Sequence, residues 1–245
     1  MDATYRFHSR IRYSEVDSKG FLTLQSLLDY FQDSSIFHSE DRGLSVSYLN
    51  QQHVCWVLSS WQIIVDRYPK LGENITIETT PYDMKGFLGF RNFVLFDEQG
   101  QRIACANSIW SLLDTDAQKP CAVPSYMVER YGIGSKLDMP YAPRKIQMPK
   151  ELIEKESIQI KEWHLDTNHH VNNGQFVRMG LDLLPENTCI KQLRAEYKKQ
   201  ALLSDIVIPY IGTNTPDDST QCYCVSLQDS QHDVYVNMEF MTINS

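Results

Sequence analysis

The sequence predicts an α+β protein built from two similar halves, each with one long helix followed by several antiparallel strands. Three observations predict it: a helical spacing of apolar residues that occurs twice, an alternating pattern after each helix, and a proline-rich stretch between the halves. The chain has 245 residues, of which 42% are hydrophobic and 22% charged, as in an ordinary globular protein. At about 100–200 residues per domain, this length fits one large domain or two small ones.

Each predicted helix follows a polar segment that contains an aspartate, Asp17 in the first half and Asp166 in the second. The apolar residues of the first helix fall on one face: Leu24, Leu27, Leu28 and Phe31. Those of the second helix are Phe176, Val177, Gly180 and Leu184. Pro185 is expected to end the second helix. The two aspartates are 149 residues apart, so the halves begin alike.

After each helix the pattern changes to the alternation of half-buried strands. The strands predicted in the first half cover 61–65, 74–80, 90–96 and 102–113. Those in the second half cover 193–197, 206–210, 221–227 and 234–243. One offset of 132 residues relates the two sets, as in Leu71-Gly72-Glu73 and Leu203-Ser204-Asp205, which indicates a duplication. The first half therefore has 17 more residues between helix and sheet, around 35–53, where we expect a lid or an extra helix.

A helix with one apolar stripe buries that stripe by lying across a curled antiparallel sheet. This is the hot-dog arrangement. A single unit has exposed strand edges that usually pair with a second copy, so two units in one chain are expected to form an intramolecular pair. Five of the ten prolines lie between Asp114 and Lys150, and we expect hot-dog units at 1–115 and 151–245 joined by a Pro-rich linker at 116–150. The sequence leaves open a homodimer.

Charge and motif content argue against several classes of function. The formal net charge of −8 disfavours a nucleic-acid partner, because an acidic surface repels phosphates. We expect no membrane span, no secretory signal and a cytoplasmic location, with the six cysteines reduced because they form no C-x-x-C pair. The G-x-S-x-G, Walker, G-x-G-x-x-G and H-E-x-x-H motifs are missing, which removes the main support for serine hydrolases, nucleotide-binding proteins and zinc proteases.

Polar side chains concentrate directly before the second helix, at 163–173. Asp166, Asn168 and His170 alternate, so in an extended segment their side chains share one face. Such a set can hold a water and polarise a carbonyl group. His170 can act as base, Asp166 can orient it or take the proton, and Asn168 can donate to a developing oxyanion. The alternative is helix capping, which we favour for Asn172 and Asn173.

The first half serves as an internal control for this set. It keeps Asp17 opposite Asp166 but has Lys19 and Phe21 in place of the asparagine and the histidine. Only the second half can therefore carry the full set, and Asp17 is interpreted as a cap or turn residue. A metal site at His164, His169 and His170 matches no common zinc spacing, so we expect no metal and no other cofactor.

The segment 166–173, with the sequence D-T-N-H-H-V-N-N, resembles the D-x-N-x-H-V-N-N motif of acyl-ACP thioesterases. The start from Arg10 to Asp17 and the Leu71-Gly72-Glu73 turn are similar too. The resemblance implies hydrolysis of fatty acyl thioesters on acyl carrier protein, with the acyl chain in the N-terminal half and catalysis in the C-terminal half. A tandem hot-dog does not by itself distinguish carrier protein from coenzyme A. An acyl-CoA thioesterase and a non-catalytic acyl-thioester-binding protein therefore stay as alternatives.

The sequence departs from the family pattern after Tyr197-Lys198-Lys199. Plant members have a carboxylate and a cysteine after the matching Tyr-Arg-Arg stretch, whereas this chain has Gln200 and Ala201. A glutamine cannot act as a general base, and the alanine excludes a cysteine nucleophile at that place. Gln200 is instead expected to position the water through its amide. The expected catalytic residues are Asp166, Asn168, His170 and Gln200.

Overall fold

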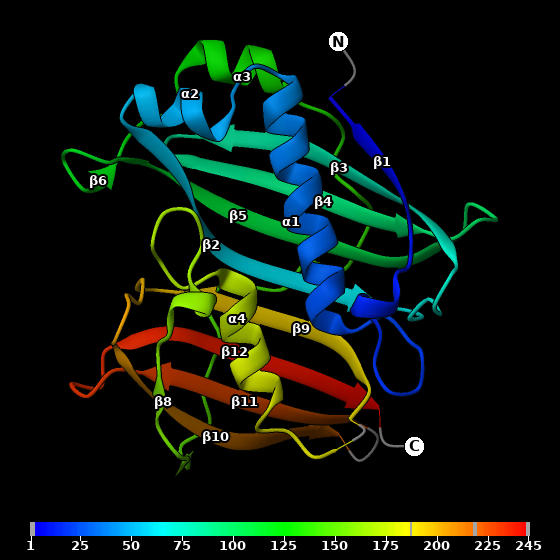
Figure 1. Cartoon of the computed structure of the whole chain (residues 1–245), viewed down its shortest axis with the longest axis vertical. Coiled ribbons are helices and arrows are strands. Elements are labelled where there is room, and N and C mark those ends of the chain that lie inside the picture. Colours follow the sequence, from blue (N-terminus) through cyan, green and yellow to red (C-terminus); the bar gives the residue numbers. More distant parts are fainter. Residues whose placement is uncertain (1–2, 187, 218–219, 244–245) are drawn as a thin grey trace. The chain divides into compact units, whose positions relative to one another are not determined.

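The computed structural model describes residues 3–186, 188–217 and 220–243. The chain divides into two compact units. The first comprises Met1–Ser59 and Ile63–Tyr141, and the second comprises Ser60–Gln62 and Ala142–Ser245. Each unit has its own helix across its own antiparallel strands, which is the hot-dog arrangement (Figure 1). The helix is long in the first unit, with 18 residues, and shorter in the second, with 9.

The first unit contains most of the helical structure. Its helical elements are the short 3-10 helix η1 (Tyr13–Glu15), α1 (Leu24–Asp41), α2 (Val46–Gln51) and α3 (Ser125–Tyr131). Its strands are β1 (Tyr5–Arg10), β2 (Val54–Val65), β3 (Asn74–Lys85), β4 (Leu88–Phe96), β5 (Arg102–Asp114) and the short β6 (Lys119–Pro120). The strand order is β1-β3-β4-β5-β2, and β6 pairs with β5. The four strands predicted for this half are confirmed, while β1 was not predicted.

Helix α1 forms as the apolar spacing predicts. Leu24, Leu27, Leu28 and Phe31 are all buried, and Phe31 packs against Phe93 of β4 with ring centroids 5.3 Å apart. Burial of each side chain of this size stabilises the fold by about 1.5–3 kcal/mol. The Thr23 hydroxyl oxygen accepts a hydrogen bond from the Ser26 N–H at 3.1 Å and caps the helix start. The extra residues around 35–53 lengthen α1 to Asp41 and form α2, so they are an extra helix.

The second unit repeats this plan with fewer helices. Its elements are β7 (Ile153–Glu154), β8 (Ile158–Gln159), the 3-10 helix η2 (Glu162–His164), α4 (Asn173–Leu181), β9 (Ile190–Tyr197), β10 (Ile206–Asp217), β11 (Thr220–Gln228) and β12 (Val234–Ile243). The strand order is β9-β12-β11-β10-β7, and β8 also pairs with β10. All four strands predicted for this half are present.

Helix α4 packs closely on its sheet through a glycine. A Cβ atom at Gly180 would lie 2.7 Å from Met238 Cε on β12, so a side chain here would displace the end of Met238. Phe176 and Val177 are buried on the same side, as predicted. The helix ends at Leu181, earlier than the expected end before Pro185. The Asp182 N–H still bonds to the Arg178 carbonyl, and the N–H groups of Leu183 and Leu184 then bond to the carbonyls three residues back, as in a tighter turn.

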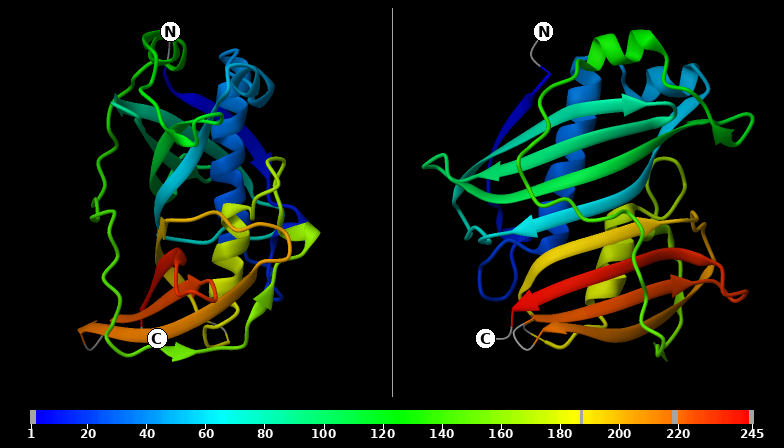
Figure 2. Two further views of the ribbon diagram at one scale, coloured as in Figure 1. Left: turned by 90° about the vertical axis from the view of Figure 1, so that its left-hand side faces the viewer. Right: turned by 180° about the vertical axis from the view of Figure 1, so that it is seen from behind.

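The stretch 116–150, expected as a linker, has structure of its own. It contains β6 and α3, and Met127 and Tyr131 of α3 are buried in a cluster with Leu44, Leu49 and Leu112. The Leu137 N–H donates to Asn92 Oδ1 at 3.0 Å within the first unit. In the second unit an Arg194 guanidinium N–H donates to the Pro143 carbonyl at 2.6 Å. Figure 2 shows the extended stretch that follows α3 on the sheet face away from the helix in each unit.

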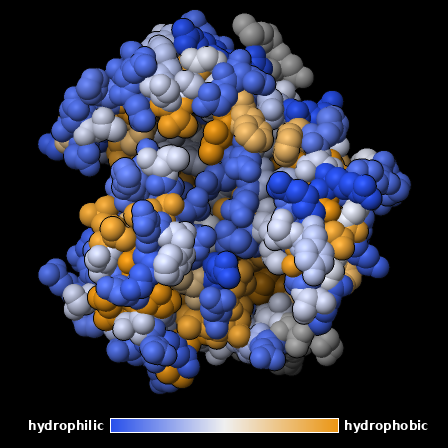
Figure 3. Space-filling model, viewed as in Figure 1, coloured by the Kyte–Doolittle hydropathy of each residue, from blue (hydrophilic) through white to orange (hydrophobic). Residues whose placement is uncertain are grey.

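In the part of the chain that the structure describes, no helix has both the length and the apolar character needed to cross a membrane. Hydrophilic and apolar residues are interspersed over the face drawn in Figure 3.

Candidate active site

The predicted site lies in the loop between η2 and α4. A β-bridge joins Leu165 to Val171 and closes the loop into a tight turn. The Asp166 N–H donates to the His170 carbonyl at 2.8 Å, and the His169 N–H donates to the Asp166 carbonyl at 3.0 Å. His169 has a φ of 62°, in the left-handed region. The segment is therefore not extended, as the alternation argument assumed, because these backbone bonds bend it.

The Asp166 side chain holds this turn from within. Its Oδ1 accepts hydrogen bonds from the Asn168 N–H at 2.8 Å and the His170 N–H at 3.2 Å. An aspartate that bonds the backbone two residues ahead forms an Asx turn. Asp166 and His170 are half-buried and Asn168 is exposed. The structure thus brings the three residues together by a turn rather than by strand alternation.

The start of α4 adds a helix N-terminus next to the turn. Asn172 is the N-cap residue, and its Oδ1 accepts a hydrogen bond from the Gly174 N–H at 2.8 Å. Asn173 is the first helical residue rather than a cap, and its carbonyl accepts a hydrogen bond from the Tyr197 hydroxyl at 3.0 Å. The free N–H groups of this helix end give the loop a positive partial charge.

Gln200 lies just after β9, in the segment that meets the turn. The Val171 N–H donates to the Ala201 carbonyl at 2.9 Å, which fixes the backbone next to Gln200 beside the backbone next to His170. Ala201 is fully buried and Gln200 is exposed. Gln200 is therefore an exposed residue beside the backbone of the turn. The structure therefore places Gln200 close in the fold to the other three predicted residues.

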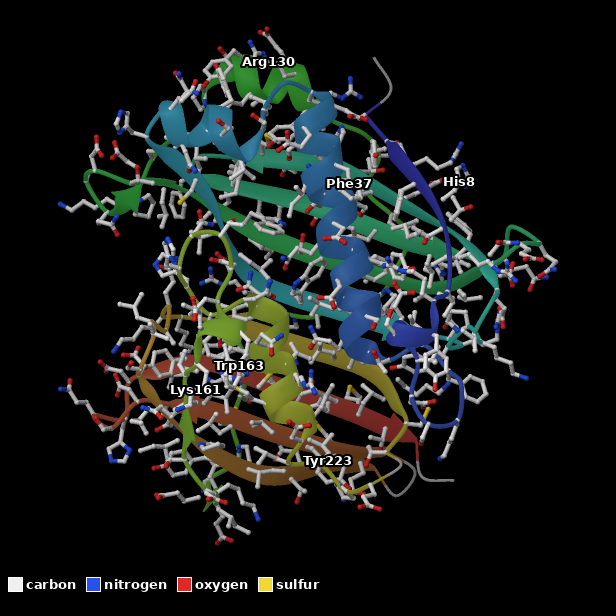
Figure 4. The ribbon with its side chains drawn as sticks, in the orientation of Figure 1. His8, Phe37, Arg130, Lys161, Trp163 and Tyr223 are labelled. Carbon is white, nitrogen blue, oxygen red and sulfur yellow. The ribbon has the colours of Figure 1, made fainter. Side chains whose placement is uncertain are left out.

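His164 is a residue of this loop whose role the sequence argument missed. Its Nδ1 accepts a hydrogen bond from the Lys161 N–H at 2.9 Å, and its carbonyl accepts one from the Asn172 N–H at 2.8 Å. Burial and the charges of Arg178 and Lys161 lower the pKa of His164. The ring is therefore neutral near pH 7 with its proton on Nε2. Figure 4 shows Lys161 and the exposed Trp163 next to α4.

The residue that matches His164 in the first half is Glu15, which makes the same kind of contact. Glu15, 149 residues earlier, accepts a hydrogen bond from the N–H of Arg12, also three residues back, at 2.7 Å. Glu15 and His164 each close a 3-10 turn with a side-chain acceptor. A position-by-position comparison of the two halves pairs Glu15 with His164, and both side chains can accept a hydrogen bond.

A group of possible metal ligands occurs elsewhere in the second unit. Among the described residues, the ligand atoms of Cys222, Cys224 and Glu239 lie within 4.8 Å of one another. Glu239 also forms an ion pair with Arg194, with Oε1 and Nη1 3.0 Å apart. The histidines of the 164–170 loop form no such group of three within the described residues.

Comparison with known proteins gives the family. A family model described as the acyl-ACP thioesterase N-terminal domain matches residues 2–131, which is more than half of the chain. The chain belongs to the acyl-ACP thioesterase family. The family that the sequence resemblance implied is thereby confirmed, and the 166–173 motif itself lies beyond the matched residues.

Curated members of the acyl-ACP thioesterase family are distant relatives. The chain is 24% identical over 217 residues to a chloroplastic acyl-[acyl-carrier-protein] hydrolase of Cuphea viscosissima, covering 80% of this chain and 52% of the relative. A palmitoyl-acyl carrier protein thioesterase of Arabidopsis thaliana is 22% identical with the same coverage. The chain spans about half the length of these curated relatives.

Solved structures of acyl-ACP thioesterases share the fold. One from Bacteroides thetaiotaomicron superposes with a TM-score of 0.84 at 21% identity, covering 98% of this chain and 97% of the other. The 12:0-ACP thioesterase from Umbellularia californica gives 0.83 at 15% identity, covering 98% and 93%. These identities establish the fold alone, and the two coverages include both hot-dog halves.

Proposed function

We propose that this chain hydrolyses the thioester bond between a fatty acyl chain and acyl carrier protein and releases a free fatty acid. The observation that carries the proposal is the turn at 166–170, which presents Asn168 and His170 at the start of α4 in a chain of the acyl-ACP thioesterase family. The relatives named above are hydrolases or thioesterases of acyl carrier protein substrates. Acyl carrier protein is accordingly the proposed partner.

In the proposed reaction the Asn168 amide donates a hydrogen bond to the thioester oxygen as that oxygen becomes negative. His170 accepts a proton from water while the water oxygen bonds to the carbonyl carbon. When the tetrahedral intermediate collapses, the carbon–sulfur bond breaks and His170 returns the proton to the leaving thiolate. The products are a carboxylic acid and the free thiol of the carrier. Gln200 holds the water through its amide, since it cannot take a proton.

The same residues favour one second candidate. Gln200 stands where plant relatives have a carboxylate, and the exposed glutamine supplies no base. A protein that binds acyl thioesters without hydrolysing them would retain the fold and the turn. Such a protein would differ from the proposed enzyme in turnover and not in binding.

The test measures thiol release from matched acyl-ACP and acyl-CoA substrates of several chain lengths. The variants Asn168→Ala and His170→Ala are compared with Lys19→Ala, which occupies the position matching Asn168 in the first unit. We expect release from acyl-ACP to be faster, and to fall on the order of 100-fold in the two site variants but not in Lys19→Ala.

Each other outcome has a distinct meaning. Equal or faster release from acyl-CoA would contradict the choice of carrier. Binding of both substrates without any release would favour the non-catalytic candidate. Full activity in His170→Ala would remove this histidine from the reaction.

A further inference from the structure

The two units build the loop before their helix with the same set of hydrogen bonds. In the first unit the Asp17 N–H donates to the Phe21 carbonyl at 2.8 Å and the Gly20 N–H donates to the Asp17 carbonyl at 3.0 Å. A bridge joins Val16 to Leu22. In the second unit the matching bonds of the Asp166 loop measure 2.8 and 3.0 Å, and a matching bridge closes it.

The neighbouring backbone anchors match as well. The Leu22 N–H donates to the Pro69 carbonyl at 2.8 Å, as the Val171 N–H does to the Ala201 carbonyl at 2.9 Å. Thr23, the helix cap of the first unit, donates its N–H to the Glu15 carbonyl at 2.9 Å, as Asn172 does to His164. The loop is thus one structural element formed twice.

The carboxylate makes the same contacts in both copies. Asp17 Oδ1 accepts hydrogen bonds from the Lys19 N–H and the Phe21 N–H, each at 2.9 Å. These are the contacts that Asp166 Oδ1 makes with the N–H groups two and four residues ahead. In the first copy the residue four positions ahead is Phe21, which cannot accept a proton, so the Asp17 carboxylate holds the turn in a loop that has no histidine base.

We infer that Asp166 is a positioning residue, whose carboxylate orients the backbone of Asn168 and His170, and that it is not the proton acceptor of the reaction. The inference rests on the proposed function, because it presumes that a thioester is hydrolysed here. The positioning role itself is inferred from the duplicated loop. It assigns the proton transfer to His170. The two N–H groups that Asp166 holds belong to the two residues that meet the substrate, so losing the carboxylate would misdirect both side chains.

The experiment compares Asp166→Asn and Asp166→Ala with the matched pair Asp17→Asn and Asp17→Ala. Asparagine keeps the acceptor oxygen of the turn and cannot take a proton at neutral pH, whereas alanine removes the acceptor. Two quantities are measured: hydrogen exchange at the held amides, and the pH profile of kcat and KM for acyl-ACP hydrolysis.

We expect Asp166→Ala to speed exchange at the amides of Asn168 and His170 by about tenfold and to lower kcat strongly. Asp166→Asn should restore amide protection, bring kcat back to within a few fold of the wild type and keep the shape of the pH profile. Asp17→Ala should speed exchange at Lys19 and Phe21 by a similar factor, and Asp17→Asn should restore it.

Two results would overturn the inference. One is an Asp166→Asn protein as inactive as Asp166→Ala with its amides still protected, which would make Asp166 the proton acceptor. The other is unchanged amide exchange in Asp166→Ala, which would mean that the carboxylate does not hold the loop. If the wild type hydrolyses no thioester, the proposed function fails, while the exchange data still decide the role of Asp166 in the loop.

Discussion

His169 takes the left-handed backbone position in the second unit that Gly20 takes in the first, with φ values of 62° and 79°. The two residues are 149 positions apart and lie at the same point of the duplicated loop. A Cβ atom at Gly20 would meet no other atom within 4 Å, so space does not restrict this position. The cost of a side chain here is the backbone conformation itself.

This relationship predicts opposite effects for two substitutions. Gly20→Ala should lower the free energy of unfolding by about 1 kcal/mol, because a residue with a Cβ is strained in the left-handed region. His169→Gly should raise it by less than that, since relief of strain is offset by the greater freedom of glycine in the unfolded chain. Urea unfolding of the three proteins measures both. A Gly20→Ala protein as stable as the wild type would show that the turn adapts without cost.

The buried histidine of the first unit predicts a pH dependence of stability. His38 is 1% exposed, and its Nδ1 lies 3.0 Å from Arg91 Nη1. Burial, with the charges of Arg91 and Arg42, lowers the pKa of His38 to about 3. An unfolded histidine has a pKa of about 6.5. Between these values the unfolded chain gains a proton that the folded chain does not, so acidification favours unfolding.

Stability should therefore fall as the pH drops below about 6.5, by up to about 1.4 kcal/mol per pH unit from this residue, and its contribution should be flat above that pH. His38→Gln keeps an acceptor for Arg91 and should show a shallower slope in urea unfolding at a series of pH values. His8→Gln is the control, because His8 is exposed on β1 (Figure 4) and should keep the wild-type slope. Identical slopes in all three proteins would contradict the assignment.

Gly212 of β10 lies where the neighbouring backbone leaves no room for a side chain. A Cβ atom at Gly212 would lie 2.6 Å from the Glu151 carbonyl oxygen and 2.8 Å from Pro149 Cγ. Backbone cannot move aside as a flexible side chain can, so Gly212→Ala must push the 149–152 segment off the sheet. We expect a loss of about 1–3 kcal/mol in the free energy of unfolding.

The matched variant is Gly180→Ala, where the first atom met is the mobile end of Met238 and where alanine favours the helix. It should destabilise less than Gly212→Ala. The reverse order in urea midpoints would show that the 149–152 segment is the more adaptable of the two neighbours.

The exposure of the cysteines predicts the order in which their thiols react. Cys189 is exposed, Cys55 and Cys121 are half-buried, and Cys222 and Cys224 are buried. A thiol-reactive dye should label Cys189 first, and Cys189→Ser should remove the fast phase. Quantifying labelled thiols over time in the native protein measures this. A fast phase that survives in Cys189→Ser would show that another thiol is reached by local opening. The variant also lowers the background of a thiol-release assay.

Much of the fold could be predicted because each unit repeats one strong pattern. The helix faces and the eight long strands are regular over enough residues for the spacing to be clear. Strand β1 was missed because Arg6, His8 and Arg10 alternate with inward residues on a short edge strand, where nothing apolar continues on the outer face. Helix α3 was missed because the prolines around it dominate the local signal, although Met127 and Tyr131 are core residues.

The sequence predicted which residues of the site lie together, but it did not predict the turn that brings them together. Alternation of Asp166, Asn168 and His170 is compatible with a strand, and the sequence of that loop has no glycine to signal a left-handed turn. The signal was in the other half, where Gly20 stands at the matching position. The roles of Asp166, Asn168, His170 and Gln200 in the reaction stay predictions.

The duplicated loop separates the frame of the site from its reactive groups. The frame depends on one aspartate and on backbone atoms, whereas the two units differ at the residues two and four positions further on. Exchange of two side chains can therefore add reactive groups to such a loop, or remove them, without changing its backbone. In this chain the first loop has the same backbone hydrogen bonds as the second but lacks the asparagine and the histidine. Placing asparagine and histidine at positions 19 and 21 would therefore build the second loop's side-chain set on an existing backbone.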